Sequence, residues 1–311
     1  MPAPRILFMG TPEFALDSLR ACLEVGEVVA VVTQPDKPRD RGQASSAPPV
    51  KRLALEHGLK VLQPTKLRDA PFLDSLRTRS PEVALVAAYG KILPRELLDL
   101  PASGSVNVHA SLLPRFRGAA PIQWAIASGD QTTGVCLMKM ELGLDTGPVL
   151  ASAHVAIRPD ETYESLWPVL ARLGAQLIRT HLLAYLRGEL HPTPQPSEGV
   201  VLAPMLKKED GLLDFRKSAA ELERRARAFQ PWPGTFVFLG GKILKVRQAR
   251  LGDGSGPPGT VLSSTAKGIE VACGSGSLWL AELQPEGKRA MTAADFLAGH
   301  QISVGDRPFG A

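Results

Sequence analysis

The chain has 311 residues, of which 44% are hydrophobic, and this is enough apolar surface for one or two buried cores. No apolar run approaches the roughly 18 residues that a membrane-spanning helix needs, so we expect a globular protein that does not enter a membrane. The net charge of +5 is too small to identify a partner, so the position of the charge matters more than its total.

The first half of the chain alternates β-like apolar runs with amphipathic segments, as in βαβ units that build a parallel sheet covered by helices. Apolar residues at helical spacing predict helices over residues 13–25 and 166–186. The predicted strands cover residues 5–8, 27–33, 82–88 and 105–109. We therefore expect an α/β domain with a Rossmann-like parallel sheet.

A proline-rich stretch, HPTPQPSEG, follows the second predicted helix and is typical of a linker between domains. We expect a first domain over residues 1–188, a linker over 189–206 and a smaller β-rich domain over 207–311. In the smaller domain, one helix is predicted at 219–229. Short strands are predicted at 235–239, 242–247, 259–263, 269–272 and 278–283, and this pattern favours a small barrel.

The excess positive charge lies in the second domain. Residues 207–250 contain 11 Lys/Arg and 5 Asp/Glu, a local charge of +6, which leaves −1 for the rest of the chain. From the charge count alone, a solvated helix face explains such a segment more readily than a site for a polyanion does. The three cysteines, Cys22, Cys136 and Cys273, are far apart in a chain without a secretory leader, so we expect reduced thiols and a cytoplasmic protein.

An unusual group of polar residues ends the predicted strand at 105–109. Asn107 and His109 are two residues apart in an extended segment, so their side chains point to the same face. Asp145 lies in a turn between Gly143 and Gly147. Ligand sites of open α/β sheets lie at the carboxyl ends of the strands, so we expect the three polar side chains to meet there.

A carboxamide, an imidazole and a carboxylate suit acyl transfer to an amine, because the amine itself attacks and no enzyme nucleophile is needed. Asn107 and protonated His109 would stabilise the oxyanion. Asp145 would orient His109 and accept the amine proton, directly or through water. Each residue alone also has an ordinary alternative, since a histidine at a strand end is often structural and an aspartate between glycines often only forms a turn.

Residues 107–121, NVHASLLPRFRGAAP, resemble the motif of the folate-dependent formyltransferases, which use 10-formyltetrahydrofolate and have a Rossmann-like catalytic domain. The resemblance implies that Asn107, His109 and Asp145 are the catalytic residues. It also implies two walls of a folate site, formed by Ser111, Leu112, Leu113 and Pro114 on one side and by Tyr89, Gly90, Ile92 and Leu93 on the other.

Three further stretches resemble the branch of this family that formylates initiator methionyl-tRNA. They are MGTPEF at 9–14, the loop from QPDKP to RG at 34–42, and FQPWPGT at 229–235. The resemblance implies an OB-like second domain that holds tRNA. The expected tRNA-binding residues are Lys37, Arg39 and Arg41 in the loop at 34–42, and Lys207 and Arg247 in the basic segment of the second domain. Many relatives carry a lysine pair after the residue equivalent to Gly42, whereas this chain does not, so we expect its loop to bind phosphates less strongly.

Two classes of cofactor are not expected. The loop after the first strand lacks GxGxxG, which argues against a nucleotide cofactor, and the His and Cys residues lack the spacing of metal ligands. Two alternatives stay open beside the tRNA acceptor: formylation of a small amine, and a tRNA-binding module without activity. A basic second domain favours the tRNA acceptor, and we expect a monomer.

Overall fold

The computed structural model describes residues 2–36 and 46–310, which form two compact units. The first unit comprises Met1–Pro121, Thr132–Ala156 and Trp167–Pro204. The second comprises Ile122–Gln131, Ile157–Leu166 and Met205–Ala311. Two short segments from earlier in the chain thus pack with the C-terminal residues, and the domain bounds expected from the sequence stay a prediction.

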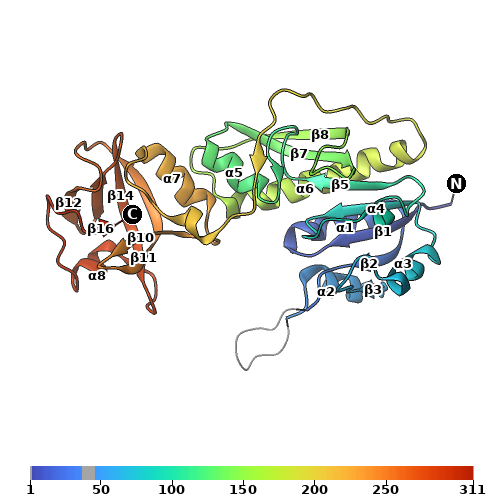
Figure 1. Cartoon of the computed structure of the whole chain (residues 1–311), viewed down its shortest axis with the longest axis horizontal. Helices are drawn as coiled ribbons and strands as arrows, with labels where there is room; N and C mark the ends of the chain where they lie inside the picture. Colours follow the sequence, from blue (N-terminus) through green and yellow to red (C-terminus); the bar gives the residue numbers. More distant parts are fainter. Residues whose placement is uncertain (1, 37–45, 311) are drawn as a thin grey trace. The chain divides into compact units, whose positions relative to one another are not determined.

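A seven-stranded sheet with the order β3-β2-β1-β4-β5-β7-β8 organises the first unit (Figure 1). Its parallel strands are β1 (Arg5–Gly10), β2 (Glu27–Val32), β3 (Val61–Leu62), β4 (Val83–Ala87) and β5 (Ser105–His109). β7 (Thr132–Lys139) pairs antiparallel with both β5 and β8 (Val149–Ala156). The predicted parallel sheet is confirmed, and the antiparallel edge is an addition that the short β7–β8 connection allows.

The helices up to residue 186 include both of those predicted from the sequence, at 13–25 and 166–186. They are η1 (Glu13–Ala15), α1 (Leu16–Val25), α2 (Pro49–Glu56), α3 (Ala70–Arg77), α4 (Arg95–Leu98), α5 (Pro121–Ser128) and α6 (Tyr163–Leu186). Across residues 2–36 and 46–310, we find no helix with the length and apolar character required to cross a bilayer.

The packing around β5 decides which way its polar side chains point. A Cβ atom at Gly174 of α6 would lie 2.5 Å from Cγ1 of Val108, so this helix packs directly on one face of β5. Successive side chains of a strand point to opposite faces, so Asn107 and His109 point away from α6. On their face, further along the sheet, side chains of α3 and α4 such as Leu76 and Leu97 complete a buried core.

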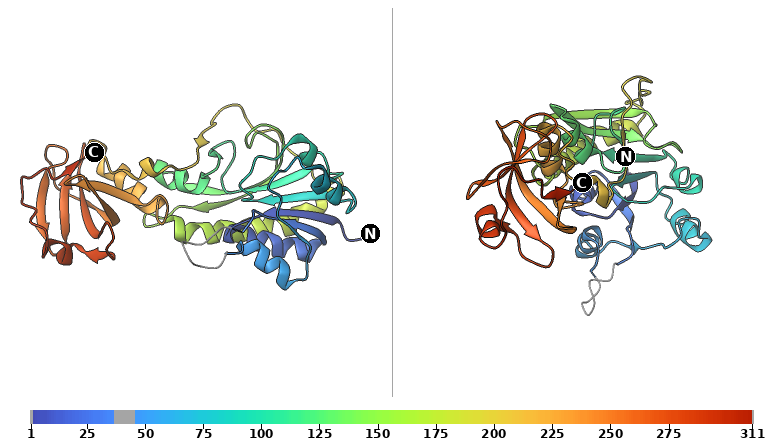
Figure 2. Two further views of the ribbon diagram at one scale, coloured as in Figure 1. Left: turned by 60° about the horizontal axis from the view of Figure 1, so that its bottom comes forward. Right: turned by 60° about the vertical axis from the view of Figure 1, so that its left-hand side comes forward.

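The second unit is built on an antiparallel sheet with the order β12-β13-β14-β11-β10-β16, which curls on itself (Figure 2). Its strands are β10 (Thr235–Leu239), β11 (Lys242–Gly252), β12 (Val261–Thr265), β13 (Gly268–Ala272), β14 (Ser277–Pro285) and β16 (Phe309–Gly310), with β15 (Met291–Thr292) beside β14. Its helical elements after residue 205 are η2 (Lys208–Gly211), α7 (Ala219–Ala228) and α8 (Ala293–Leu297). The predicted β-rich second domain is confirmed.

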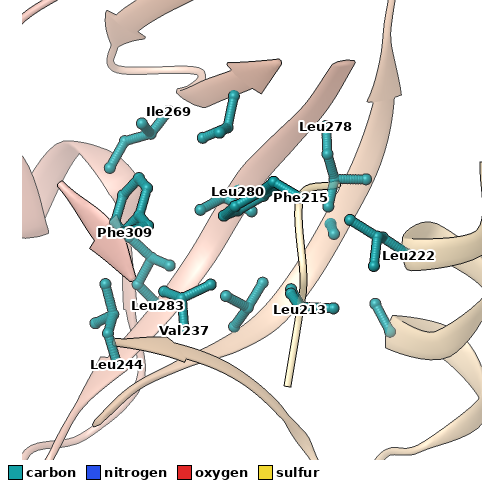
Figure 3. Packing of buried hydrophobic residues seen from close by; sticks show 14 of the residues in the cluster. Leu213, Phe215, Leu222, Val237, Leu244, Ile269, Leu278, Leu280, Leu283 and Phe309 are labelled. Carbon is teal, nitrogen blue, oxygen red and sulfur yellow. The ribbon is translucent and has the colours of Figure 1, made fainter. Parts of the chain in front are cut away.

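One apolar core holds this second unit together (Figure 3). Leu222 of α7 is buried against strand residues such as Val237, Leu278 and Leu280. Phe215, which precedes α7, packs with a tilted ring against Phe309 of β16, with 6.1 Å between the ring centroids. The helix and the curled sheet therefore share a core, as expected for a domain with its own hydrophobic interior.

Candidate active site

The carboxyl end of β5 and the loop between β7 and β8 bring two of the expected catalytic residues together. Nδ1 of His109 lies 3.7 Å from Oδ2 of Asp145, and the two side chains are 5% and 14% exposed. Asn107 is half-buried two residues earlier on β5 and points to the same face as His109. The three residues thus lie at the sheet edge where ligands of α/β folds bind.

The second nitrogen of His109 has a partner that fixes its proton. Nε2 lies 2.9 Å from the carbonyl oxygen of Phe116, which can only accept a hydrogen bond, so Nε2 carries a hydrogen. The neutral imidazole would then point the lone pair of Nδ1 at the carboxylate of Asp145. The doubly protonated ring would point an N–H there instead.

The loop after β5 folds back through its own hydrogen bonds. The hydroxyl of Ser111 is buried and donates to the carbonyl of Arg115 at 2.6 Å. The N–H of Leu113 donates to Sγ of Cys136 at 3.4 Å. Burial raises the pKa of the Cys136 thiol to about 11, so the sulfur is an uncharged acceptor at neutral pH. These contacts place the carbonyl of Phe116 within hydrogen-bond distance of Nε2 of His109.

Asp145 is held in an uncommon backbone conformation, with φ at 51°. Its Oδ2 accepts a hydrogen bond of 2.8 Å from the N–H of Gly118. Gly118 has φ at 126°, and a Cβ there would lie 2.5 Å from the carbonyl oxygen of Ala203, so no larger residue fits. Phe116 and Gly118 lie inside the motif at 107–121, but their roles were not predicted, because each contributes a main-chain group.

Of the residues expected to bind folate, one wall comes from the chain after β4. Tyr89 and Leu93 are buried in the core, whereas Ile92 is 88% exposed. The hydroxyl of Tyr89 is buried and has no hydrogen-bond partner among the described residues, and burial raises its pKa to about 12. Its carbonyl accepts hydrogen bonds of 3.1 Å from Thr11 and Gln34, which anchors the turn at Gly90.

The other expected wall is the loop after β5. Ser111 and Pro114 are buried there, while Leu112 and Leu113 are half-buried. Leu112 lies against β7, since a Cβ at Gly134 would come within 2.6 Å of its Cδ2 atom. This wall therefore offers partly accessible apolar side chains beside His109.

The residues expected to bind tRNA fall into two groups. Lys37, Arg39 and Arg41 lie outside the described residues. Lys207 is exposed just before η2, and Arg247 is half-buried on β11. In the same unit, a hollow of about 290 Å³ is lined by Lys208, Trp232, Pro233, Thr235, Phe236, Ile243, Lys245, Gln284, Pro285, Glu286 and Gly287. Trp232 is 59% exposed, so this hollow combines cations with an accessible aromatic ring.

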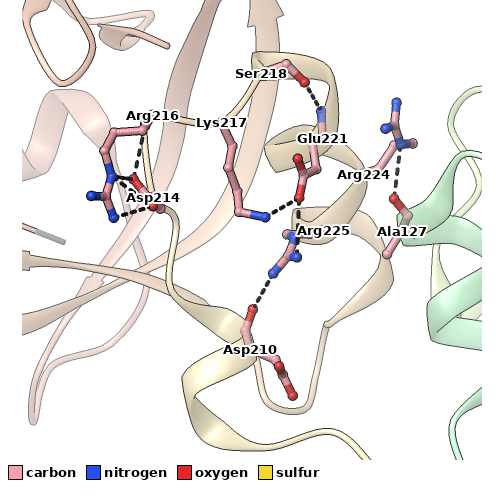
Figure 4. Close-up of polar contacts among 9 residues, drawn as sticks. All are labelled: Ala127, Asp210, Asp214, Arg216, Lys217, Ser218, Glu221, Arg224 and Arg225. Carbon is pink, nitrogen blue, oxygen red and sulfur yellow. Dashed lines mark hydrogen bonds and ion pairs between the residues drawn. The ribbon is translucent and has the colours of Figure 1, made fainter. Parts of the chain in front are cut away.

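The basic residues before and on α7 are mostly neutralised by neighbours (Figure 4). Arg216 forms an ion pair with Asp214 at 2.7 Å, and Arg225 forms one with Glu221 at 3.3 Å. On β11, by contrast, Lys245 and Arg247 form no ion pair with any described residue. The positive charge available for a partner therefore lies on β11 more than on α7.

No group of three or more His, Cys, Asp or Glu side chains within the described ranges is arranged to hold a metal ion. The expectation that the protein needs no metal stays a prediction.

Comparison with known proteins places both units in one family. Residues 4–182 match the family described as formyl transferase, and residues 205–301 match the family described as formyl transferase, C-terminal domain. Among solved structures, HypX from Aquifex aeolicus in complex with tetrahydrofolic acid aligns with a TM-score of 0.61 at 18% identity, over 97% of this chain and 50% of that one. The sugar 3N-formyl transferase WlaRD aligns with a TM-score of 0.66 at 15% identity, over 93% of this chain and 100% of that one. At these identities the likeness shows the fold alone.

Similarity to curated proteins is much higher and extends over the whole length. The methionyl-tRNA formyltransferase of Myxococcus xanthus is 65% identical over 309 residues, which cover 99% of each chain. That of Citrifermentans bemidjiense is 50% identical over 306 residues, which cover 98% of this chain and 96% of the relative. The formyltransferase resemblance predicted from the motif after β5 is confirmed, and the chain belongs to the methionyl-tRNA formyltransferase family.

Proposed function

We propose that this protein transfers the formyl group of 10-formyltetrahydrofolate to the amino group of methionine esterified to initiator tRNA. The observation that carries the proposal is the facing pair of His109 Nδ1 and Asp145 Oδ2, 3.7 Å apart, at the carboxyl end of β5. Full-length identity to proteins named for this reaction supports the choice of acceptor. The product, formylmethionyl-tRNA, would serve translation initiation.

In the proposed reaction, the amine nitrogen attacks the formyl carbon, and no covalent intermediate forms on the enzyme. The amine adds to the formyl carbon, whose oxygen becomes an oxyanion. The bond from this carbon to N10 of the folate would then break, and N10 would take up a proton in place of the one that the amine has lost. Asn107 and the protonated ring of His109 would stabilise the oxyanion, an effect worth roughly 3 kcal/mol for one good donor. Asp145 would accept the amine proton, directly or through water.

The contacts favour different roles for the two ring nitrogens of His109, and for the two carboxylate oxygens of Asp145. Nε2 of His109 is bound to the Phe116 carbonyl, so Nδ1 is the nitrogen that would meet the reacting atoms. Oδ2 of Asp145 accepts the Gly118 N–H, while Oδ1 accepts no hydrogen bond from the described residues. Oδ1 would therefore be the oxygen that receives the proton from the amine.

The folate would lie between the two walls beside this pair. Leu112 and Leu113 would supply one apolar surface, and exposed Ile92 would supply the other. The unsatisfied hydroxyl of Tyr89 fits a site that receives a polar ligand, because a buried donor without a partner costs free energy. Ser111 is expected to act by folding the loop, since its hydroxyl is bound to the Arg115 carbonyl.

The tRNA would contact the second unit through Lys207 and Arg247, and through the hollow that contains Lys245 and Trp232. Lysine and arginine bind phosphates, and an exposed aromatic ring can stack on a base. We also place Lys37, Arg39 and Arg41 at the acceptor end of the tRNA. Residues 1–188 would form the catalytic domain and 207–311 the tRNA-binding domain of a cytoplasmic monomer.

One assay tests the acceptor. The protein is incubated with 10-formyltetrahydrofolate and either methionyl-tRNA, free methionine or an amino sugar nucleotide, and formylated product is measured. We expect turnover with methionyl-tRNA, and a kcat/KM at least about 100-fold lower with the small amines, since they lack the contacts of the tRNA. Comparable kcat/KM values with free methionine or the amino sugar would contradict the tRNA assignment.

A further inference from the structure

Gln195 lies in the proline-rich segment after α6 and makes four hydrogen bonds at the site. Its Nε2 donates to the carbonyl of Asp145 at 2.8 Å and to the carbonyl of Gly147 at 2.7 Å. Its Oε1 accepts from Nε of Arg117 at 3.0 Å and from Nη2 at 2.7 Å. Carbonyls only accept and a guanidinium only donates, so the orientation of this amide is determined by its partners.

These contacts belong to a closed ring of hydrogen bonds that joins Asp145, Gln195, Arg117 and Gly118. The residue after Arg117 is Gly118, whose N–H donates to Oδ2 of Asp145 at 2.8 Å. Arg117 therefore supports Asp145 through its side chain by way of Gln195, and through the adjoining main chain. The main chain of Arg117 and Gly118 is itself held in place, because these residues form β6 (Arg117–Gly118), which pairs with β9 (Leu202–Ala203).

The loop that carries Asp145 needs such support. Its φ of 51° lies in the left-handed region, which residues other than glycine adopt only when their surroundings hold them there. The loop also packs closely against the end of β7 at Gly147, since a Cβ there would lie 1.9 Å from the carbonyl oxygen of Lys139. A small shift of the Asp145 main chain would therefore turn its carboxylate away from His109.

We propose that Gln195 and Arg117 are positioning residues that hold the carboxylate of Asp145 opposite Nδ1 of His109. The inference rests on the proposed function, because it takes Asp145 as the group that serves the reaction. Gln195 acts through Asp145 and does not meet the reacting atoms. Its loss should therefore lower kcat and leave the binding of both substrates nearly unchanged.

The first test is Gln195→Glu, which has the same shape. The new carboxylate can still accept from Arg117, but its second oxygen would face the carbonyls of Asp145 and Gly147, where a donor is required. We expect kcat to fall roughly 10- to 100-fold, as for other small displacements of catalytic groups, with both KM values within about twofold. The matched control is Glu198→Gln, at an exposed position of the same segment, which should keep wild-type kcat.

The second test separates positioning from a general structural role. Gln195→Ala, Asp145→Asn and the double variant are compared by kcat and by thermal midpoint. If Gln195 acts through Asp145, Gln195→Ala lowers kcat in the wild type but by less than about twofold in the Asp145→Asn background. Equal losses in both backgrounds would overturn the proposal.

The outcomes separate the positioning role of Gln195 from the proposed role of Asp145 in the reaction. Full activity in both Gln195 variants would end the positioning proposal and leave the proposed function intact. Full activity in Asp145→Asn alone would instead end the proposed role of Asp145. If the Gln195 variants fail to fold, as judged by circular dichroism, Arg117→Lys replaces Gln195→Ala in the comparison with Asp145→Asn and the double variant. It keeps the charge but loses the two N–H donors that converge on Oε1 of Gln195, so we expect the same non-additive loss.

Discussion

The edge of the first sheet and strand β11 of the second unit hold their functional groups in opposite ways. At the edge, His109 and Asp145 are nearly buried, and main-chain groups of Phe116 and Gly118 hold them. On β11, Lys245 is exposed and has no ion-pair partner among the described residues. A reacting group must keep one geometry, whereas a phosphate contact needs only charge that can adapt to its partner.

The largest expected effect comes from removing the imidazole. His109→Ala should lower kcat/KM for methionyl-tRNA roughly 10²- to 10⁴-fold, because proton transfer and charge stabilisation are both lost. Binding of tRNA, measured by filter retention, should not change, since His109 is not among the cations proposed to bind phosphates. A variant that keeps normal turnover would show that the buried pair is structural.

A smaller loss is expected when the main-chain support is disturbed. Gly118→Ala places a Cβ within 2.5 Å of the Ala203 carbonyl at a φ of 126°, so β6 must move and the N–H that holds Asp145 moves with it. We expect kcat to fall roughly 10- to 100-fold. Gly188→Ala is the control, since Gly188 also has a positive φ of 72° but no atom within 4 Å of the new Cβ. Equal kcat in both variants would mean that the position of Gly118 is unimportant for the reaction.

The smallest effect is expected on β11, where each cation makes a separable contribution. Lys245→Ala and Arg247→Ala should each raise the KM for tRNA a few-fold with kcat unchanged. Removing one cation that binds a phosphate should flatten the slope of log affinity against log salt by about 0.7 to 0.9. Arg216→Ala is the control, because its guanidinium is already paired with Asp214. If all three variants show the wild-type slope, the cations of β11 are ordinary surface residues.

Local patterns were sufficient to predict the parallel strands β1, β2, β4 and β5 and the principal helices. β5 (Ser105–His109) was predicted with the bounds that it has, because Val106 and Val108 alternate with polar residues at the two-residue period of a strand. The short elements α2 and β3 were not predicted, since 8 and 2 residues carry too little periodicity to stand out. The antiparallel strands β7 and β8 were also missed, although both are 8 residues long.

The sequence by itself determined the family and the catalytic residues to test, because a long motif after one strand specifies chemistry as well as local structure. Only the tertiary structure decided what holds Asp145 in place. Gln195 is 50 residues away from Asp145 in sequence, within a segment whose prolines indicate only a linker. Its contacts with Asp145 and Gly147 are made to main-chain carbonyls, which every residue possesses, so no pattern of side chains could have revealed them.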